Sequence, residues 1–115
     1  MTTIILALSL LASATDDYTS AKAACERDGR PLLVLTCAGW CEPCKRIHDW
    51  IPILRGRGRL VVLDVDLDTQ LAASLTDIGP IPRLAIYHRV KGQWMRRIRV
   101  GIDEIKEEVF PSELR

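Results

Sequence analysis

Residues 32–45, LLVLTCAGWCEPCK, place three of the chain's four cysteines directly behind an apolar run. The run at residues 32–36 is typical of a central strand that is covered on both faces. From Cys41 onward the sequence is typical of a helix, and Pro43 suits its first turn because proline lacks only an N–H that has no partner there. The cysteines therefore lie where a buried strand passes into a helix, a common position for functional sites in α/β proteins.

The sequence on both sides of this stretch alternates between helix and strand patterns. Residues 18–29 are rich in helix formers behind Asp16 and Asp17, and they end at Gly29. Five further elements are expected downstream of the cysteine helix, in the order strand, helix, strand, strand and helix. They are expected at residues 60–68, 69–78, 83–90, 93–100 and 103–110. This order predicts an α/β fold with a mixed central sheet of about four strands and helices on both faces.

Three local patterns have simple structural interpretations. Pro52 is expected to end or kink the cysteine helix. The basic stretch RGRGR at residues 55–59 is expected to form a solvated loop rather than a nucleic-acid patch. Asp64, Asp66 and Asp68 alternate at a strand end, where one of them is expected to cap the next helix, because the glycine and distal glutamate of a calcium-binding EF-hand loop are missing.

Length and charge limit the function classes. With 115 residues, 48% apolar and 27% charged, the chain fits one compact domain. The formal net charge is +1 and the sequence pI is about 7.7. Such a chain has no long-range field with which to hold nucleic acid or an anionic membrane, so neither is expected as a partner. A monomer is expected.

The first fourteen residues are predicted to be a cleaved leader in front of a domain at residues 15–115. The apolar run from Ile4 to Leu11 is followed by small residues, as at a signal-peptidase site, and it is far below the ~20 residues of a membrane span. The segment lacks a basic residue, and the alternative is a leading β-strand. The protein is therefore expected to be exported if this leader is cleaved, and cytoplasmic otherwise.

The cysteine spacing favours redox chemistry. Cys41 is expected at a helix N-terminus, where free N–H groups and the helix dipole favour a thiolate, so it is the candidate nucleophile. Cys44 lies one turn further along and is the candidate resolving thiol. Trp40 is expected to form an apolar wall beside the attacking sulfur.

Together with GPIPRLAIY at residues 79–87, the motif AGWCEPCK at residues 38–45 resembles the thioredoxin superfamily. The resemblance covers about residues 16–110 and implies the three-layer thioredoxin-like sandwich. It also implies that Pro82 is the cis-proline that faces the disulfide, with Ile81 before it, and that these residues bind a substrate strand. The stretch at residues 16–35 further resembles exported thioredoxin-like domains.

Several positions depart from the family's pattern. The family's buried carboxylate corresponds to Leu35, and the lysine that pairs with it corresponds to Val62, so the usual proton acceptor for Cys44 is missing. In the active-site loop, Glu42 beside the nucleophile should oppose thiolate formation, and Lys45 and Arg46 should partly compensate. Arg83 replaces the family's usual threonine and is expected to make the substrate-binding surface more basic.

The cysteine spacing also resembles two kinds of metal-binding site. The spacing of Cys37, Cys41 and Cys44 also occurs in radical S-adenosylmethionine enzymes, which need a much larger barrel. Zinc bound by these three cysteines with Cys25 or His48 fits by ligand type, but a second paired motif is missing. No metal and no organic cofactor are therefore expected.

The remaining cysteines and histidine have simpler expected roles. Cys25 and Cys37 are expected to be inert core thiols, with a Cys25–Cys37 bridge or an attack of Cys37 on Cys41 as alternatives. His48 is expected to be an exposed histidine, with proton transfer for Cys44 as the alternative.

The sequence thus predicts a thiol-disulfide oxidoreductase that acts on protein disulfides through Cys41 and Cys44. In the resembling family, an isoleucine at the position of Ile81 is typical of reducing members, so a protein-disulfide reductase is expected. Its expected partners are protein disulfide or dithiol substrates and an electron donor, membrane-bound if the protein is exported. The rival hypothesis is a binding or assembly module of the same fold with little redox turnover.

Overall fold

The structure is a computed structural model that describes residues 14–111, so the predicted leader lies outside the described residues except for Ala14. Four strands form one sheet in the order β2-β1-β3-β4. They are β1 (Leu32–Cys37), β2 (Arg59–Asp64), β3 (Arg83–Val90) and β4 (Gln93–Val100). Strand β1 runs parallel to β2 and antiparallel to β3, and β3 runs antiparallel to β4. The sheet is therefore mixed, as predicted.

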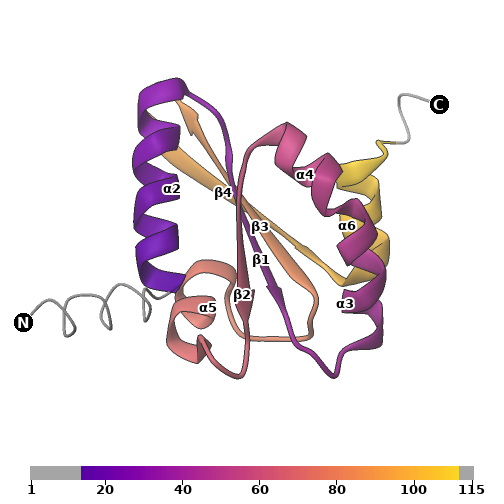
Figure 1. The fold of residues 1–115 in the computed structure, drawn as a ribbon. Coiled ribbons are helices and arrows are strands. Elements are labelled where there is room, and N and C mark those ends of the chain that lie inside the picture. The colour runs from indigo at the N-terminus through magenta and orange to yellow at the C-terminus, as the bar shows by residue number, and fades with distance from the viewer. Residues whose placement is uncertain (1–13, 112–115) are drawn as a thin grey trace, which may run out of the picture.

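Helices cover both faces of the sheet, which gives three layers (Figure 1). On one face lie α2 (Ala14–Asp28) and α5 (Thr69–Thr76). On the other lie α3 (Glu42–Ile47), α4 (Ile51–Arg57) and α6 (Gly101–Val109), with a short 3₁₀ helix η1 (His48–Trp50) between α3 and α4. The predicted helix-covered α/β sheet is confirmed.

Strand β1 separates two apolar clusters because its side chains alternate between the two faces. Leu33, Leu35 and Cys37 face the cluster under α3, α4 and α6, which also holds Cys41 and Cys44 and is called here the disulfide-side cluster. Leu32 and Val34 face the α2-side cluster, which lies under α2 and α5. All six β1 residues are buried, and each large apolar side chain contributes about 1.5–3 kcal/mol through removal from water.

The segment after the cysteines differs from its prediction. The α-helix breaks at η1, before Pro52, and Pro52 lies in the first turn of α4. A proline is tolerated there because the first-turn N–H groups have no helical partner. The new helix continues to Arg57, so the prediction of a loop at residues 55–59 was wrong.

Gly58 marks the actual end of α4. A Cβ at this position would lie 2.5 Å from the carbonyl oxygen of Pro31, so only glycine permits this close approach of two backbones. Strand β2 starts at the next residue, where the Arg59 N–H donates to the Pro31 carbonyl over 2.9 Å. No helix within residues 14–111 is long and apolar enough to cross a membrane.

Candidate active site

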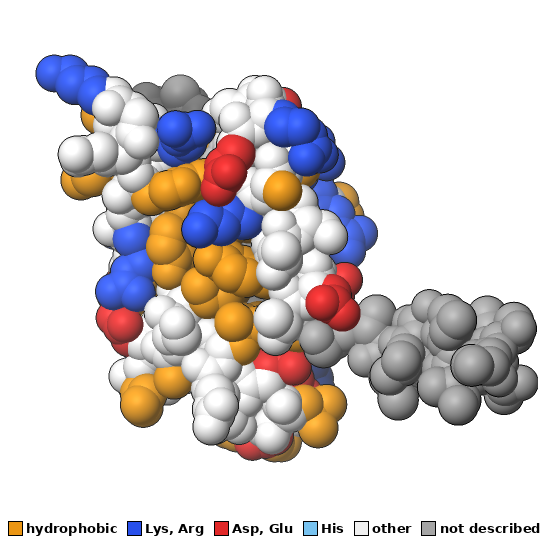
Figure 2. All heavy atoms as spheres, turned by 90° about the vertical axis from the view of Figure 1, so that its left-hand side faces the viewer, with side chains coloured by type: hydrophobic (Ala, Val, Ile, Leu, Met, Phe, Trp, Pro, Cys, Tyr) orange, Lys and Arg blue, Asp and Glu red, His pale blue; other side chains and the backbone are white. Residues whose placement is uncertain are grey.

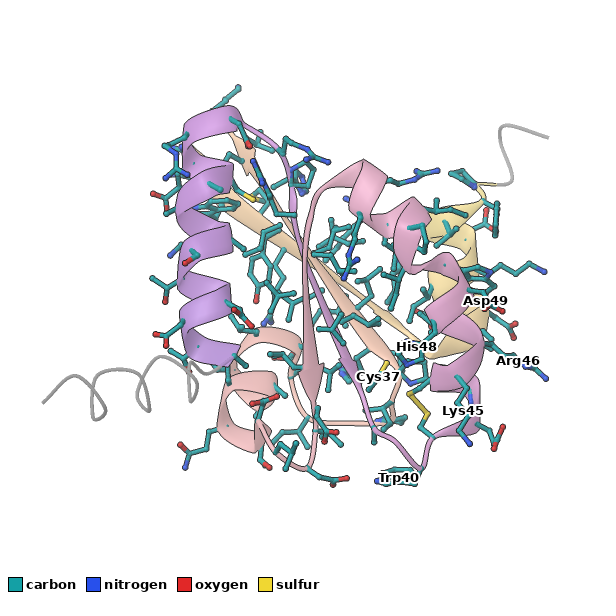
Figure 3. The ribbon with its side chains drawn as sticks, viewed as in Figure 1. Cys37, Trp40, Lys45, Arg46, His48 and Asp49 are labelled. Carbon is teal, nitrogen blue, oxygen red and sulfur yellow. A yellow bond between two sulfur atoms is a disulfide. The ribbon has the colours of Figure 1, made fainter. Side chains whose placement is uncertain are left out.

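A disulfide joins Cys41 and Cys44 at the start of α3 (Figure 3). Cys41 is the N-cap residue of this helix, with extended backbone angles, and the two Cα atoms are 5.2 Å apart. The Cys44 backbone N–H donates to Cys41 Sγ across 3.3 Å. Because an N–H directed at sulfur favours negative charge there, the geometry supports Cys41 as the residue that carries a thiolate after reduction.

Both sulfur-bearing residues are nearly enclosed. Cys41 is 4% exposed and Cys44 is 1% exposed, and both pack in the disulfide-side cluster. Trp40, by contrast, is 67% exposed, and its indole Nε1–H donates to Asp66 Oδ2 over 2.8 Å. An exposed indole, held by one hydrogen bond, therefore lies directly before the buried disulfide in the chain.

Charged side chains surround the loop on its outer side. Glu42 and Lys45 form an ion pair of 3.0 Å, and both side chains are mostly exposed. Solvent screens such a pair, so its contribution to stability is at most about 1 kcal/mol. The ion pair places the Lys45 ammonium group against the carboxylate that follows Cys41 in the chain. Figure 3 shows Lys45, Arg46 and Asp49 projecting outward from this part of the chain.

The loop before β3 meets the disulfide at the same end of the sheet. The Ile81–Pro82 peptide bond is cis, Pro82 is buried, and Ile81 packs against the disulfide-side cluster. The Pro82 carbonyl accepts a hydrogen bond from the Gly101 N–H over 2.8 Å, which ties this loop to the start of α6. The fold thus brings Ile81 and Pro82 together with Cys41 and Cys44, although they are distant in sequence.

Arg83 does not lie as expected. Its residue is only 8% exposed, and its Nε–H donates to the carbonyl oxygen of Thr76 at the end of α5 over 2.7 Å. In the β1–β3 register it pairs with Thr36, whose side chain is on the α5 face of the sheet, away from the disulfide-side cluster. The expectation that Arg83 makes an open surface more basic was wrong, because the side chain satisfies the carboxyl end of a helix instead.

The missing carboxylate is confirmed as a structural feature. Leu35 is 1% exposed inside the disulfide-side cluster, and Val62 is its direct partner in the β1–β2 register. Val62 is 41% exposed, so a charged partner there would have reached solvent. Apolar packing therefore surrounds Leu35 in the same cluster as Cys44, at the position where the resembling family has a proton acceptor.

The other two cysteines are buried free thiols on opposite faces of the sheet. Cys25 Sγ lies 3.5 Å from the Pro31 carbonyl oxygen in the α2-side cluster, so the Cys25–Cys37 bridge was wrong. Cys37 belongs to the disulfide-side cluster (Figure 3). Burial, with a smaller contribution from the Asp64 carboxylate, raises the pKa of the Cys37 thiol to about 11. Cys37 is therefore protonated at neutral pH, as expected of an inert core thiol.

The remaining site predictions have mixed outcomes. His48 is exposed, as expected, although it lies on η1 rather than on an α-helix. Within residues 14–111 no group of three or more His, Cys, Asp or Glu side chains is placed to hold a metal ion, so the zinc set is not assembled. Asp68 precedes α5, but its side chain accepts from the Asp64 N–H and does not cap the helix.

Sequence reasoning missed two supporting residues. Asp66 holds the Trp40 indole, and Gly101 holds the Pro82 carbonyl with a backbone φ of +84°. The alternation of Asp64, Asp66 and Asp68 draws attention to Asp66, but it does not predict a contact with Trp40. Gly101 precedes the helix expected at residues 103–110, and that helix pattern does not predict its contact with Pro82.

Comparisons with known proteins support the fold. No protein-family model matches the sequence, and a comparison with curated proteins finds no match. Among solved structures, thioredoxin from Trichomonas vaginalis is 21% identical, with a TM-score of 0.64 over 90% of this chain and 93% of that one. The germline-specific thioredoxin Deadhead of Drosophila melanogaster is 20% identical, with a TM-score of 0.65 over 90% and 95%. Plasmodium falciparum thioredoxin is 20% identical, with a TM-score of 0.64 over 78% and 75%.

These similarities extend over most of each chain. At 20–21% identity, these similarities show the fold and do not show the activity. The chain has the fold of the thioredoxin superfamily.

Proposed function

We propose that the protein catalyses thiol-disulfide exchange on protein disulfides through Cys41 and Cys44. The observation that carries the proposal is the placement of Cys41 as N-cap of α3, with its sulfur accepting from the Cys44 N–H. A helix N-terminus lowers the pKa of a thiol, and the second thiol one turn away can close the disulfide reversibly. The bonded pair in the structure is the oxidised state of this cycle.

In the reducing direction the cycle has two exchange steps. The Cys41 thiolate attacks one sulfur of the substrate disulfide, so a Cys41–substrate bond forms and the substrate's own S–S bond breaks, releasing one substrate thiolate. Cys44, after losing its proton, attacks Cys41 Sγ; the intramolecular disulfide forms and the second substrate thiolate leaves. Two electrons pass to the substrate, and a dithiol donor must then reduce the protein again.

The surroundings of the disulfide suit a protein substrate. Trp40 offers an exposed indole, and Ile81, before the cis peptide bond, lies at the same end of the sheet. An added substrate strand could pair with the backbone of Ile81, as in other cases of strand addition. Ile81 before the proline favours the reductase direction. If the leader is cleaved, the dithiol donor would act outside the cytoplasm; otherwise it is cytoplasmic.

The test is to trap the mixed disulfide. A Cys44→Ser variant is expected to accumulate a covalent complex with a disulfide-containing protein such as oxidised ribonuclease, because Cys41 can attack but nothing can resolve the product. A Cys41→Ser variant should form none, and Cys37→Ser should behave as the parent. Complexes that persist in Cys41→Ser, or that appear through Cys37, would contradict the assigned roles.

The buried Leu35 motivates a second candidate, a binding module with little turnover. Without an internal carboxylate, the proton on Cys44 has to leave through water or a surface group, so the resolving step is expected to be slow. If Cys41→Ser binds a target protein as tightly as the parent, and the parent shows no exchange with it, the binding module is the better account.

A further inference from the structure

A cavity lies beside Ile81, on the α5 face of the sheet. Its volume is about 160 Å³, enough for about five water molecules or a similar number of non-hydrogen ligand atoms. Most of its lining is apolar or without a side chain, and this part consists of Val65, Ala72, Ala73, Ile78, Gly79 and Ile81. Ile81 thus contributes both to this cavity and to the proposed substrate-binding backbone.

One buried cation faces this apolar space. Arg83 lines the cavity and is more than nine-tenths buried, and its Nε–H is fixed by the Thr76 carbonyl over 2.7 Å. Among residues 14–111, Nη1 and Nη2 have no hydrogen-bond partner. Gly79 leaves the room that the guanidinium occupies, since a Cβ there would lie 2.5 Å from Nη1. The guanidinium is therefore anchored at Nε in the cavity lining, and Nη1 and Nη2 are available to a ligand.

The other polar groups of the lining are already satisfied. The Thr69 hydroxyl donates to the Val65 carbonyl over 2.8 Å, and the Thr36 hydroxyl contacts the hydroxyl of the neighbouring Thr76 at 3.0 Å. Because the Thr76 hydroxyl donates to the Ala72 carbonyl over 2.8 Å, Thr36 is the donor in that contact. The Asp77 carboxylate also lines the cavity, and it is paired with Arg96 at 3.2 Å. The polar groups of the lining that have no hydrogen-bond partner among the described residues are therefore Nη1 and Nη2 of Arg83, next to an apolar surface.

We propose that this cavity binds a carboxylate carried on a short aliphatic stem, with the two oxygens on Arg83 Nη1 and Nη2 and the stem against Ala72, Ala73 and Ile81. A buried guanidinium matches a carboxylate in shape and charge, and hydrogen bonds between ionised groups are the strong ones in proteins. A glutamate side chain beyond its Cα has five non-hydrogen atoms, which the cavity can hold. The carboxylate comes from a glutamate of the substrate strand or from a free carboxylic acid, and only the former source rests on the proposed function.

The binding is tested with propionate and its uncharged analogue. In titrations of the full chain followed by amide NMR, sodium propionate should shift the signals of Ala72, Ala73 and Gly79 saturably, and propionamide should not. Arg83→Gln should weaken binding roughly tenfold or more, because the amide replaces a charged donor pair. Arg89→Gln removes the same charge from the exposed end of β3 and should leave binding unchanged.

A second variant, which fills the cavity, keeps the test informative if Arg83→Gln does not fold. Ala73→Leu keeps the hydrogen bond between Arg83 and Thr76 but occupies the cavity, so it should abolish propionate binding while the unfolding transition is retained. Saturable binding that survives both variants, or its absence in the parent protein, would overturn the proposal.

Exchange kinetics identify the source of the carboxylate. A series of disulfide peptides serves as substrates, and each peptide carries one glutamate at a different position beside the cysteine. For every position, a peptide with glutamine in place of glutamate is the control. A preference for glutamate at one position, lost in Arg83→Gln, assigns the site to the substrate strand; propionate binding without any such preference assigns it to a free acid. Propionate binding without any disulfide exchange would contradict the proposed function and support the carboxylate site. Disulfide exchange without propionate binding would support the proposed function and contradict the carboxylate site.

Discussion

At the residue scale, Cys37 and Cys41 lie in one apolar cluster but differ in what surrounds their sulfurs. Cys41 Sγ accepts a backbone N–H at a helix N-terminus, whereas Cys37 ends β1 within reach of the Asp64 charge. The first environment favours a thiolate and the second favours a thiol. Burial alone therefore does not decide which cysteine reacts.

The raised pKa of Cys37 predicts a loss of stability at alkaline pH. Its folded pKa of about 11 lies above the ordinary value of 9.0, so between these two pH values the unfolded chain releases a proton that the folded chain keeps. This contribution is fully present below pH 9 and is lost as the pH rises towards 11. Urea unfolding from pH 8 to 11 should show a smaller decline in Cys37→Ala than in the parent; equal declines would contradict the prediction.

The residues that replace the family's buried charged pair predict unequal effects on stability. Leu35→Ala should lower the free energy of unfolding by about 2–5 kcal/mol, because it leaves a cavity in the disulfide-side cluster. Val62→Ala, at the register partner, should cost less than about 1 kcal/mol because that side chain is 41% exposed. Chemical denaturation of both oxidised variants measures the difference, and similar losses would argue against the assigned burial.

At the element scale, the junction of β4 and α6 holds the proline loop. Gly101 donates to the Pro82 carbonyl with φ at +84°, in the region where side chains are strained. Gly101→Ala should therefore destabilise the protein by about 1 kcal/mol, although a Cβ there would meet no atom within 4 Å.

Gly56 is the matched control for this glycine. It lies within α4, and its Cβ would also meet open space, so Gly56→Ala should stabilise the protein by about 0.5–1 kcal/mol through helix propensity. Opposite signs of the two changes in thermal unfolding are expected. The same sign for both would contradict the backbone argument.

Helix α6 is also joined to β4 by charge. Glu108 Oε1 and Oε2 accept from Arg97 at 3.0 Å each, and Oε1 accepts from Arg99 at 2.7 Å. Hydrogen bonding to Arg97, with a smaller contribution from Arg99, holds the pKa of Glu108 below its ordinary value of 4.5. The stability that this carboxylate contributes is present above pH 4.5 and is lost as the pH falls through the lowered pKa.

This network gives a pH-dependent prediction. Glu108→Gln should lower the free energy of unfolding by about 1 kcal/mol near neutral pH. On acidification the variant should lose less stability than the parent, because it lacks the carboxylate whose protonation breaks the ion pairs in the parent. Glu26→Gln, on the exposed side of α2, removes a carboxylate elsewhere and is the control. Acid unfolding curves that coincide for parent and Glu108→Gln would contradict the assignment.

At the scale of the whole molecule, both functional proposals concern one end of the sheet but opposite faces. The disulfide lies on the α3 face, and the Arg83 cavity lies on the α5 face, with Ile81 contributing to both. Another hollow, of about 120 Å³, lies between α2 and the β3–β4 hairpin and is lined by Tyr18, Lys22, Leu32, Tyr87 and Trp94. Figure 2 shows this side of the molecule, with apolar side chains gathered around a cationic one.

The sequence predicts the fold well because the strongest patterns are local. The all-apolar β1, the helix start at Cys41 and the turn at Lys91 and Gly92 each specify their own geometry, and their order limits the topology. The helix through residues 55–57 was missed because Pro52 can end one helix or begin another, and the sequence does not distinguish the two.

The partners of site residues are less predictable. Arg83 is charged and follows a loop, which favours exposure, but its position in the register turns it towards the end of α5. The contact between Trp40 and Asp66 likewise depends on how the loops that follow β1 and β2 meet at one end of the sheet. Such contacts follow from tertiary packing, which a single sequence specifies only weakly.

The reduction potential of the Cys41–Cys44 pair tests the central claim most directly. The full chain is equilibrated in dithiothreitol or glutathione redox buffers, free thiols are trapped, and the peptide that contains both cysteines is followed by mass spectrometry. The account predicts one two-electron transition confined to this pair, close to about −270 mV, with Cys25 and Cys37 remaining free thiols throughout. A potential near about −120 mV would contradict the reductase direction, and the absence of any defined transition would contradict the redox function itself.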